Sequence, residues 1–338
     1  MPRLLAEPRL TRLLVAAGVF PPGAFVLVDV GANGGVARHW DVLGPAARHV
    51  AFEPDARECA RPNAACRDAR VTYYPYALAG QSGPRTFWVR GFGAGCSFFP
   101  CTDRRALARF FPDEFVRTLA DAERAVALDA VAFDEFAARE RLPPPDFMKL
   151  DVEGAELEIL EGASRALAGL LGACVEVHFD ETLAPAAPFW AIDRFMQARG
   201  FRLFDLDVAR YARRALPQPY CRDHRTPDGR PFPGPTVAGK PQLADALYLR
   251  DVVDDLRTGR RAYAAADVLK ACCLYELHAL PDYAAELLLE VAGAGGLDVE
   301  PLLDLLVPEV RGERLPHREH VRSLVERPER FRPGAGGA

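Results

Sequence analysis

Residues 146–156, DFMKLDVEGAE, contain the feature that most limits the possible fold: a short apolar run that leads directly into acidic groups and a helical pattern. The run FMKL is typical of a buried parallel strand, and Asp151 and Glu153 come where it ends. In an open α/β sheet, ligands bind at the carboxyl ends of the strands, so carboxylates at this edge are placed for chemistry. The alternative is that either carboxylate caps the helix that follows.

A strand with a glycine-rich turn lies closer to the N-terminus, at residues 25–35, FVLVDVGANGG. The apolar run reaches Asp29 and then turns at Gly31, Asn33 and Gly34, before a helical pattern. Glycine suits such a turn, because a cofactor has to approach the backbone closely and some turn positions need a positive φ. The segment predicts a strand, a tight turn and a helix that together hold a cofactor.

The next strand lies in HVAFEPD and ends at Glu53, 22 positions after Gly31. An acidic residue about 20 positions beyond a glycine turn is placed to accept hydrogen bonds from ribose hydroxyls. The two segments together therefore predict a ligand that contains adenosine.

The turn distinguishes between two such ligands. An NAD-binding turn has the pattern G-x-G-x-x-G, but Asn33 and Val36 occupy the second and third glycine positions here. S-adenosylmethionine has no pyrophosphate to bind at a helix N-terminus, so its turn tolerates other residues, with Asp29 close to the charged amino acid end of the cofactor. We therefore favour an S-adenosylmethionine-dependent methyltransferase and keep an NAD-linked oxidoreductase as a less favoured alternative.

Four segments then occur in a fixed order: DVGANGG, AFEPD, VALD at residues 126–129, and FMKLDVEGAELEILEGA at residues 147–163. This order resembles that of the FkbM family of S-adenosylmethionine-dependent methyltransferases, over about residues 25–206. The resemblance implies an α/β fold of the Rossmann-like class I methyltransferase type, with a mostly parallel seven-stranded sheet flanked by helices. It also implies methyl transfer, usually to a hydroxyl oxygen of a sugar, glycan or natural product.

Two sets of site residues are predicted from the resemblance and the strand ends. The cofactor set comprises Asp29, Gly31, Asn33, Gly34, Glu53, Pro54, Asp55 and Ala77. The catalytic set, on the acceptor side, comprises Asp151, Glu153 and His178. Methyl transfer needs little covalent help, since the sulfonium is a good leaving group and positioning removes much of the barrier. A pocket with modest acid–base groups would therefore suffice.

The segment 174–180, CVEVHFD, carries Glu176 and His178 on one face of a further strand. Central parallel strands are normally apolar on both faces, so these two groups need an explanation. One is a Glu–His pair satisfied within the core. The other is a general base, either His178, whose unperturbed pKa of about 6.5 suits removal of a hydroxyl proton, or Asp151. A divalent metal site, which we do not predict, could draw on Asp151, Glu153, Glu176 and His178.

Composition argues against several classes of function. The 338 residues include 49% hydrophobic residues, enough for a sizeable core, and the formal net charge is -5. With a pI near 5.9, the chain lacks the basic character of a nucleic-acid-binding protein. No run reaches the 18 or so apolar residues of a membrane span, and the eight cysteines show no C-x-x-C spacing. We therefore expect a cytoplasmic enzyme with reduced thiols, no membrane span and no nucleic-acid partner. The resemblance to the FkbM family implies a small-molecule or glycan acceptor.

The hydrophobic pattern divides the chain into four parts. We expect an N-terminal helical lead-in, a methyltransferase domain, a C-terminal subdomain of four or five helices and a disordered tail, at 1–24, 25–250, 251–330 and 331–338. Within the second part, FRLFDLD and ADALYLR are expected as the last two strands, the final one antiparallel. Helices are expected near 35–43, 55–65, 103–122 and 188–199.

Two further segments are expected near the acceptor. In the resembling family, the region around Cys96 and Ser97 shapes the acceptor side, although an excursion that buries Phe98 and Phe99 is the alternative. A long loop at roughly 212–243 is either a solvated surface loop or contacts an anionic acceptor through Arg222, His224, Arg225 and Arg230.

A function of a different class is also considered: a non-catalytic protein that keeps the fold as a scaffold and binds a partner through its C-terminal helices. The intact turn and second strand argue against it, since a scaffold has no need for Gly31 or Glu53. The C-terminal helices lie outside the resemblance, and homodimer formation is one role considered for them.

Overall fold

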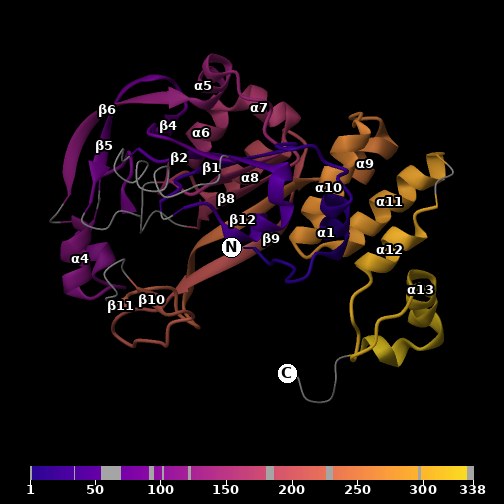
Figure 1. The fold of residues 1–338 in the computed structure, drawn as a ribbon. Coiled ribbons are helices and arrows are strands. Elements are labelled where there is room, and N and C mark those ends of the chain that lie inside the picture. Colours follow the sequence, from indigo (N-terminus) through magenta and orange to yellow (C-terminus); the bar gives the residue numbers. More distant parts are fainter. Residues whose placement is uncertain are drawn as a thin grey trace. The chain divides into compact units, whose positions relative to one another are not determined.

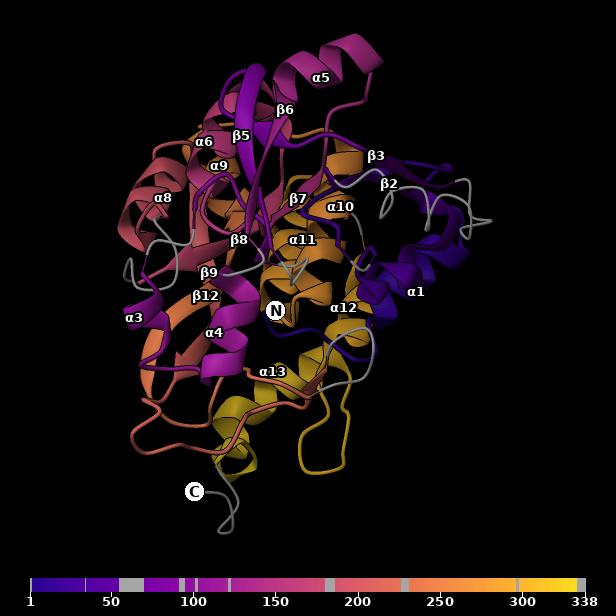
Figure 2. The same ribbon diagram turned by 90° about the vertical axis from the view of Figure 1, so that its left-hand side faces the viewer.

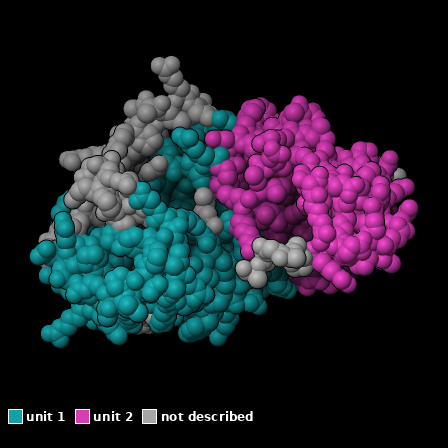
Figure 3. Space-filling model, turned by 90° about the horizontal axis from the view of Figure 1, so that it is seen from below, with its two compact units in different colours: residues 1–2, 23–38, 47–250 teal, residues 3–22, 39–46, 251–338 magenta. Residues whose placement is uncertain are grey.

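The computed structural model describes residues 2–33, 35–54, 70–90, 95–100, 103–120, 123–179, 186–225, 231–295 and 298–332. They form two compact units, which Figure 3 shows in teal and magenta. The first unit comprises residues 1–2, 23–38 and 47–250, and the second comprises residues 3–22, 39–46 and 251–338. The N-terminal segment therefore groups with the C-terminal part of the chain.

A seven-stranded sheet forms the centre of the first unit, in the order β3-β2-β1-β7-β8-β12-β9. Figure 1 labels β1, β2, β8, β9 and β12 of this sheet, and Figure 2 labels β3 and β7. The strands are β1 Phe25–Val30, β2 Ala47–Phe52, β3 Val71–Tyr74, β7 Phe147–Leu150, β8 Gly172–His178, β9 Phe201–Tyr211 and β12 Lys240–Arg250. Neighbouring strands are parallel, except that β12 runs antiparallel to both β8 and β9. The predicted α/β sheet, with its antiparallel last strand, is confirmed.

The central strands are apolar because they are buried on both faces. Val28, Met148 and Val175, from β1, β7 and β8, belong to one core cluster and are at most 3% exposed. Flanking helices add Phe136, Ile159 and other apolar side chains to the same cluster. These helices are α5 Phe133–Glu140, α6 Glu156–Gly162, α7 Ser164–Gly169 and α8 Phe189–Gln197.

The parallel register brings the strand ends that carry the site to one edge of the sheet. Val30 at the end of β1 pairs with Phe52 in β2 and with Leu150 in β7, and Leu150 pairs in turn with Val175 in β8. Functional groups at this edge come from the residues directly after these pairs, which are Gly31, Glu53, Asp151 and Glu176.

The residues between β3 and β7 in the chain form a smaller three-stranded sheet. Its strands are β4 Leu78–Ala79, β5 Gly83–Val89 and β6 Arg124–Ala132, in the order β4-β6-β5. β5 and β6 pair antiparallel and lie side by side in both views (Figure 1 and Figure 2). Beyond β5, Ser97 pairs with Trp88 through two backbone hydrogen bonds. The expected helical region near 103–122 contains two short helices, α3 Arg104–Leu107 and α4 Asp113–Ala120.

The helix expected near residues 35–43 is wrong in type and position. The chain instead forms 3-10 turns, η1 Arg38–Ala46, which Gly44 interrupts with φ 49° and ψ -132° and which contain Pro45. Glycine adopts this non-helical conformation easily and proline lacks a backbone N–H, so an α-helix does not form. The helix expected near 55–65 lies outside the described residues.

The long connection between β9 and β12 is more ordered than expected. β9 continues to Tyr211 and β12 begins at Lys240, and between them β10 His224–Arg225 pairs antiparallel with β11 Pro231–Phe232. An isolated bridge joins Tyr220 and Thr236. Such pairs satisfy backbone polar groups, which the irregular loop predicted for this segment would leave to solvent.

The second unit is helical. Its elements are α1 Arg9–Ala16, η1, α9 Val252–Thr258, α10 Ala265–Leu277, α11 Pro281–Gly295, α12 Glu300–Leu306, α13 His317–Glu326 and η3 Pro328–Phe331. The amphipathic N-terminal helix and the C-terminal helices expected from the pattern are thus present. Among the described residues, none of the helices combines the length and apolar character needed to cross a bilayer.

A distant carboxylate caps helix α1. Pro8 at the N-cap position makes no side-chain cap. The buried carboxylate of Glu276 in α10 instead accepts hydrogen bonds from the backbone N–H groups of Leu10 (2.9 Å) and Thr11 (2.7 Å). It also accepts one from the Thr11 hydroxyl (2.7 Å). This arrangement satisfies N–H groups that have no partner within the helix and places a negative charge at its positive end.

Candidate active site

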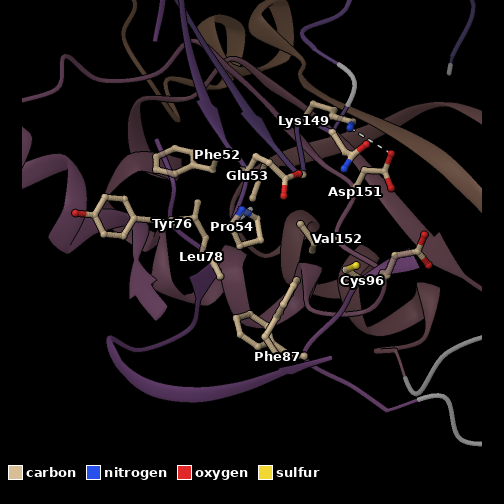
Figure 4. A pocket seen from close by; sticks show the side chains of 16 residues that line it. Phe52, Glu53, Pro54, Tyr76, Leu78, Phe87, Cys96, Lys149, Asp151 and Val152 are labelled. Atoms are coloured by element: carbon tan, nitrogen blue, oxygen red, sulfur yellow. Dashed lines mark ion pairs between the residues drawn. The ribbon is translucent and has the colours of Figure 1, made fainter. Parts of the chain in front are cut away.

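A cavity of about 140 Å³ opens at the carboxyl edge of the sheet and joins the two halves of the predicted site (Figure 4). Five residues of the predicted cofactor set line it: Gly31, Asn33, Glu53, Pro54 and Ala77. Asp151 and Glu153 of the predicted catalytic set line it as well. Gly34 and Asp55 lie outside the described residues.

The turn after β1 has room only for glycine at position 31. Gly31 has φ +83°, and a Cβ atom built there would lie 2.0 Å from the backbone oxygen of Asp151. The N–H groups of Gly31 and Ala32 donate to the carbonyl of Phe52, at 3.1 and 3.0 Å. The turn is therefore held against the ends of both neighbouring strands, β2 and β7, with its backbone exposed to the cavity.

Glu53 follows β2 directly and is 7% exposed. Its backbone N–H donates to the carbonyl of Tyr74 at 3.2 Å, which fixes the strand end against β3. In Figure 4 its carboxylate lies above Pro54, on the side of the cavity toward Lys149. A buried carboxylate at this place is suited to accept hydrogen bonds from a pair of hydroxyls.

Lys149 joins the two halves of the site, and the sequence reasoning missed it. Its Nζ lies 3.5 Å from Oδ1 of Asp29 and 3.2 Å from Oδ2 of Asp151. Burial lowers the pKa of Lys149, but the carboxylates of Asp151 and Asp29 raise it more, so the amine stays protonated. Burial raises the pKa of Asp29, and the positive charge of Lys149, which lowers it, offsets this only in part. A lysine within the buried run FMKL was the signal, since central parallel strands are normally apolar.

Asp29 itself does not line the cavity. It lies in β1 one residue before the lining residue Val30, and its side chain is largely buried. Within the described residues, its ion pair with the lining residue Lys149 links it to the cavity.

Glu153 is held in an unusual backbone conformation at the other end of the cavity. Its φ is +59°, in the left-handed region that side chains other than glycine rarely adopt. The buried hydroxyl of Ser97 donates to its carbonyl oxygen at 2.7 Å. Burial, and then the charges of Glu176 and Asp151, raise the pKa of Glu153 well above its usual value.

Neither Asp151 nor Glu153 caps helix α6, which begins at Glu156 after the N-cap residue Ala155. The backbone N–H groups that precede the helix donate to the Glu156 carboxylate instead, from Val152 (3.0 Å) and Gly154 (3.2 Å). The capping alternative is therefore wrong for both carboxylates, which remain directed to the cavity.

His178 lies outside the cavity lining, at the end of β8. It is 1% exposed, and its Nε2 lies 3.5 Å from Oε2 of Glu176. Within the described ranges, neither ring nitrogen makes a hydrogen bond. The two residues thus contact each other as expected for a core pair, but the pair is not satisfied by hydrogen bonds, and His178 does not face the cavity directly.

The cavity also has aromatic and apolar walls from the excursion between β3 and β7. Phe87 of β5, together with Cys96 and Phe98, lines it. Phe98 packs edge to face on Phe87 with ring centroids 5.5 Å apart, and the Arg85 guanidinium lies 4.5 Å from its ring centroid. In the long connection, Arg222 pairs with Asp207, and Arg230 lies outside the described residues.

The mostly parallel seven-stranded sheet with one reversed strand defines a class I methyltransferase fold, and the glycine turn and the acidic strand ends share one cavity at its carboxyl edge. Residues 29–203, more than half of the chain, match the family model described as Methyltransferase FkbM domain. The chain belongs to the FkbM methyltransferase family. The resemblance that the ordered segments carried is thus confirmed.

The individual proteins to which the chain is similar share low sequence identity with it. The chain is 28% identical over 155 residues to the hexuronic acid methyltransferase AglP of Haloferax volcanii. The aligned stretch covers 45% of this chain and 56% of that relative. Among solved structures, it is similar to the methyltransferase FkbM from Methylobacillus flagellatus KT, at 19% identity and a TM-score of 0.28 over 50% of this chain and 37% of that one. It is also similar to the magnesium protoporphyrin IX methyltransferase ChlM from Synechocystis PCC 6803, at 10% identity and a TM-score of 0.31 over 72% and 79%.

Proposed function

We propose that the protein transfers a methyl group from S-adenosylmethionine to a hydroxyl oxygen of a sugar, glycan or natural-product acceptor. The observation that carries this proposal is the single cavity that joins the glycine turn and Glu53 to Asp151 and Glu153. A methyltransferase needs the donor methyl group and the acceptor oxygen in one enclosed space, because in-line positioning supplies much of the catalysis. Residues 25–250 are the proposed catalytic domain.

The cofactor half is proposed from charge and shape. Gly31 exposes its backbone to the cavity, and Glu53 is suited to accept hydrogen bonds from the two ribose hydroxyls. Lys149, which lines the cavity and is protonated, is proposed to contact the carboxylate of the methionine end, and Asp29, outside the lining, is proposed to act through its contact with Lys149. The turn departs from the dinucleotide pattern at Asn33, which favours this cofactor over NAD.

The acceptor half is proposed from the groups beyond Lys149. Asp151 and Glu153 line the cavity, and the rings of Phe87 and Phe98 add apolar surface to it. Carboxylates bind sugar hydroxyls, and aromatic faces pack on the apolar faces of sugar rings. The similarity to a hexuronic acid methyltransferase supports a sugar as the acceptor.

The reaction balances with the groups present. A lone pair of the acceptor oxygen attacks the methyl carbon, and the bond from that carbon to sulfur breaks with its electron pair left on sulfur, which becomes a neutral thioether. The hydroxyl proton passes to a carboxylate of Asp151 or Glu153, the two catalytic candidates that line the cavity. The proposed part of His178 is to position Glu176, since its ring contacts that carboxylate and not the cavity.

Calorimetric titration of the purified full chain, freed of carried-over ligand, tests the cofactor. We expect micromolar binding of S-adenosylmethionine and its demethylated product S-adenosylhomocysteine, and none of NADH. Transfer of label from methyl-labelled S-adenosylmethionine to hydroxylated sugars, with uronic acids and neutral sugars in separate reactions, then tests the acceptor. Folded protein that binds NADH but neither sulfur ligand would overturn the proposal.

A further inference from the structure

Three carboxylates from two adjacent strands converge beside the cavity. Asp151 and Glu153 follow β7, Glu176 lies in β8, and one oxygen atom from each lies within 4.8 Å of the other two. Like charges this close repel one another strongly where water is partly excluded. The arrangement therefore requires either protons or a positive ion among the three groups.

The cationic side chains nearby neutralise only part of the negative charge of these three carboxylates. Lys149 contacts Asp151, but it also contacts Asp29 on its other side. Among the described residues, no lysine or arginine forms an ion pair with Glu153 or Glu176. Two of the three carboxylates thus have no permanent positive partner in the part of the chain that the structure describes.

A second, independent feature points to a ligand at this place. His178 is almost completely buried, and its Nε2 faces the cluster, 3.5 Å from Oε2 of Glu176. Neither ring nitrogen has a hydrogen-bond partner in the described ranges, and Glu176 Oε2 has none either. Buried polar groups are rarely left in this state unless an ion or another ligand completes the site.

We propose that Asp151, Glu153 and Glu176 bind one divalent cation of the Mg²⁺ or Mn²⁺ type, with His178 positioning the Glu176 carboxylate. Oxygen ligands suit these hard cations. With metal–oxygen distances of about 2.1 Å, neighbouring ligand oxygens of an octahedral site lie about 3 Å apart, so the three oxygens, now within 4.8 Å of one another, would draw closer by up to about 1.8 Å on binding the cation. Three carboxylate oxygens leave the remaining positions to water and to a hydroxyl oxygen of the acceptor.

The role of this cation rests on the proposed function. Bound to the cation, the acceptor hydroxyl would have a lower pKa and a fixed position near the methyl group. Each carboxylate gives one oxygen to the cation, so a second oxygen of Asp151 or Glu153 still accepts the proton. The cation thus refines the same acceptor site and would favour acceptors with two neighbouring oxygen atoms, such as vicinal diols or hydroxy acids.

Manganese binding tests the site without methyl transfer. Metal-free full-length protein is titrated with Mn²⁺ in the absence of cofactor and acceptor, and free Mn²⁺ is measured by electron paramagnetic resonance. We expect one saturable site per chain, with the Kd raised at least tenfold in Glu176→Gln. Glu158→Gln is the matched control, because that carboxylate pairs with Arg85 and is not one of the three converging carboxylates, and we expect the Kd for Mn²⁺ to be unchanged. Asp151→Asn is a second variant at a side chain that is 40% exposed, in case the buried change prevents folding.

S-adenosylhomocysteine binding, measured on the same samples, separates the two proposals. Protein that binds S-adenosylhomocysteine but shows no saturable Mn²⁺ binding would overturn the cation site and leave the proposed function intact. Mn²⁺ binding that Glu176→Gln and Asp151→Asn leave unchanged would also overturn it. Mn²⁺ binding that these two variants weaken and Glu158→Gln preserves would support the site, even in protein that fails to bind S-adenosylhomocysteine.

Discussion

Replacement of Gly31 by alanine tests whether the turn after β1 is shaped by its contact with Asp151. The added Cβ atom would lie 2.0 Å from the Asp151 backbone oxygen and 3.3 Å from Cγ1 of Val152. Real Cβ atoms essentially never come closer than 3.0 Å, so the Asp151 carbonyl would have to move by about 1 Å. That movement separates β1 from β7 at the point where the cofactor is proposed to bind.

The expected loss in free energy of unfolding for Gly31→Ala has two parts. The left-handed conformation, with φ +83°, costs an alanine about 1–2 kcal/mol. Overpacking against a rigid strand end adds about 1–3 kcal/mol. We therefore expect Gly31→Ala to lower the free energy of unfolding of the first unit by about 2–5 kcal/mol. The affinity for S-adenosylhomocysteine should fall more than tenfold, because the turn backbone moves.

Gly23→Ala is the matched control. Gly23 has φ +72°, but its nearest neighbour, Cβ of Arg48, would lie at an ordinary 3.8 Å. It belongs to the same unit, so its substitution should show the conformational cost of about 1–2 kcal/mol without the clash. Urea unfolding followed by tryptophan fluorescence, and calorimetry with S-adenosylhomocysteine, measure the two effects. If Gly31→Ala matched Gly23→Ala in both measurements, the steric reasoning would be refuted.

Three further predictions concern other parts of the chain. Glu53→Ala should weaken S-adenosylhomocysteine binding by about 10–100-fold through lost charged hydrogen bonds, and calorimetry showing unchanged affinity would contradict its ribose role. Glu276→Ala should destabilise the second unit by about 2–4 kcal/mol in urea unfolding, because it leaves buried donors of Leu10 and Thr11 without an acceptor. Burial, and then His39, lower the pKa of His278 to about 3. The folded state therefore holds this ring neutral, and the free energy of unfolding should fall by up to about 4 kcal/mol as pH falls from 6.5 toward 3. Unfolding curves of His278→Leu over this range should show a smaller pH dependence, and equal slopes for both proteins would contradict the assignment.

Local pattern was enough to predict most of the sheet and one side of the site. The apolar runs that end at Val30 and Leu150 are confirmed as buried parallel strands. They could be predicted because a strand that is buried on both faces consists almost entirely of apolar residues. The carboxylates of Glu53 and Asp151, which follow the strand ends at Phe52 and Leu150, lie at the sheet edge, since neighbouring strands share that edge in any parallel sheet. The 3-10 turns of η1 were missed, because a helical spacing of apolar residues does not reveal that Gly44 breaks the helix.

The sequence by itself determined the main strands and their order along the chain, the glycine at the turn and the acidic groups at the strand ends, because these follow from local periodicity and steric limits. Only the tertiary structure decided which of these groups meet. Lys149 lies between Asp29 and Asp151, and Glu176 lies beside Asp151, because the pairing of β1, β7 and β8 fixes their register. His178, chosen from the same strand pattern, lies behind Glu176 and outside the cavity, since pairing and packing decide which residues at a strand end face the open edge.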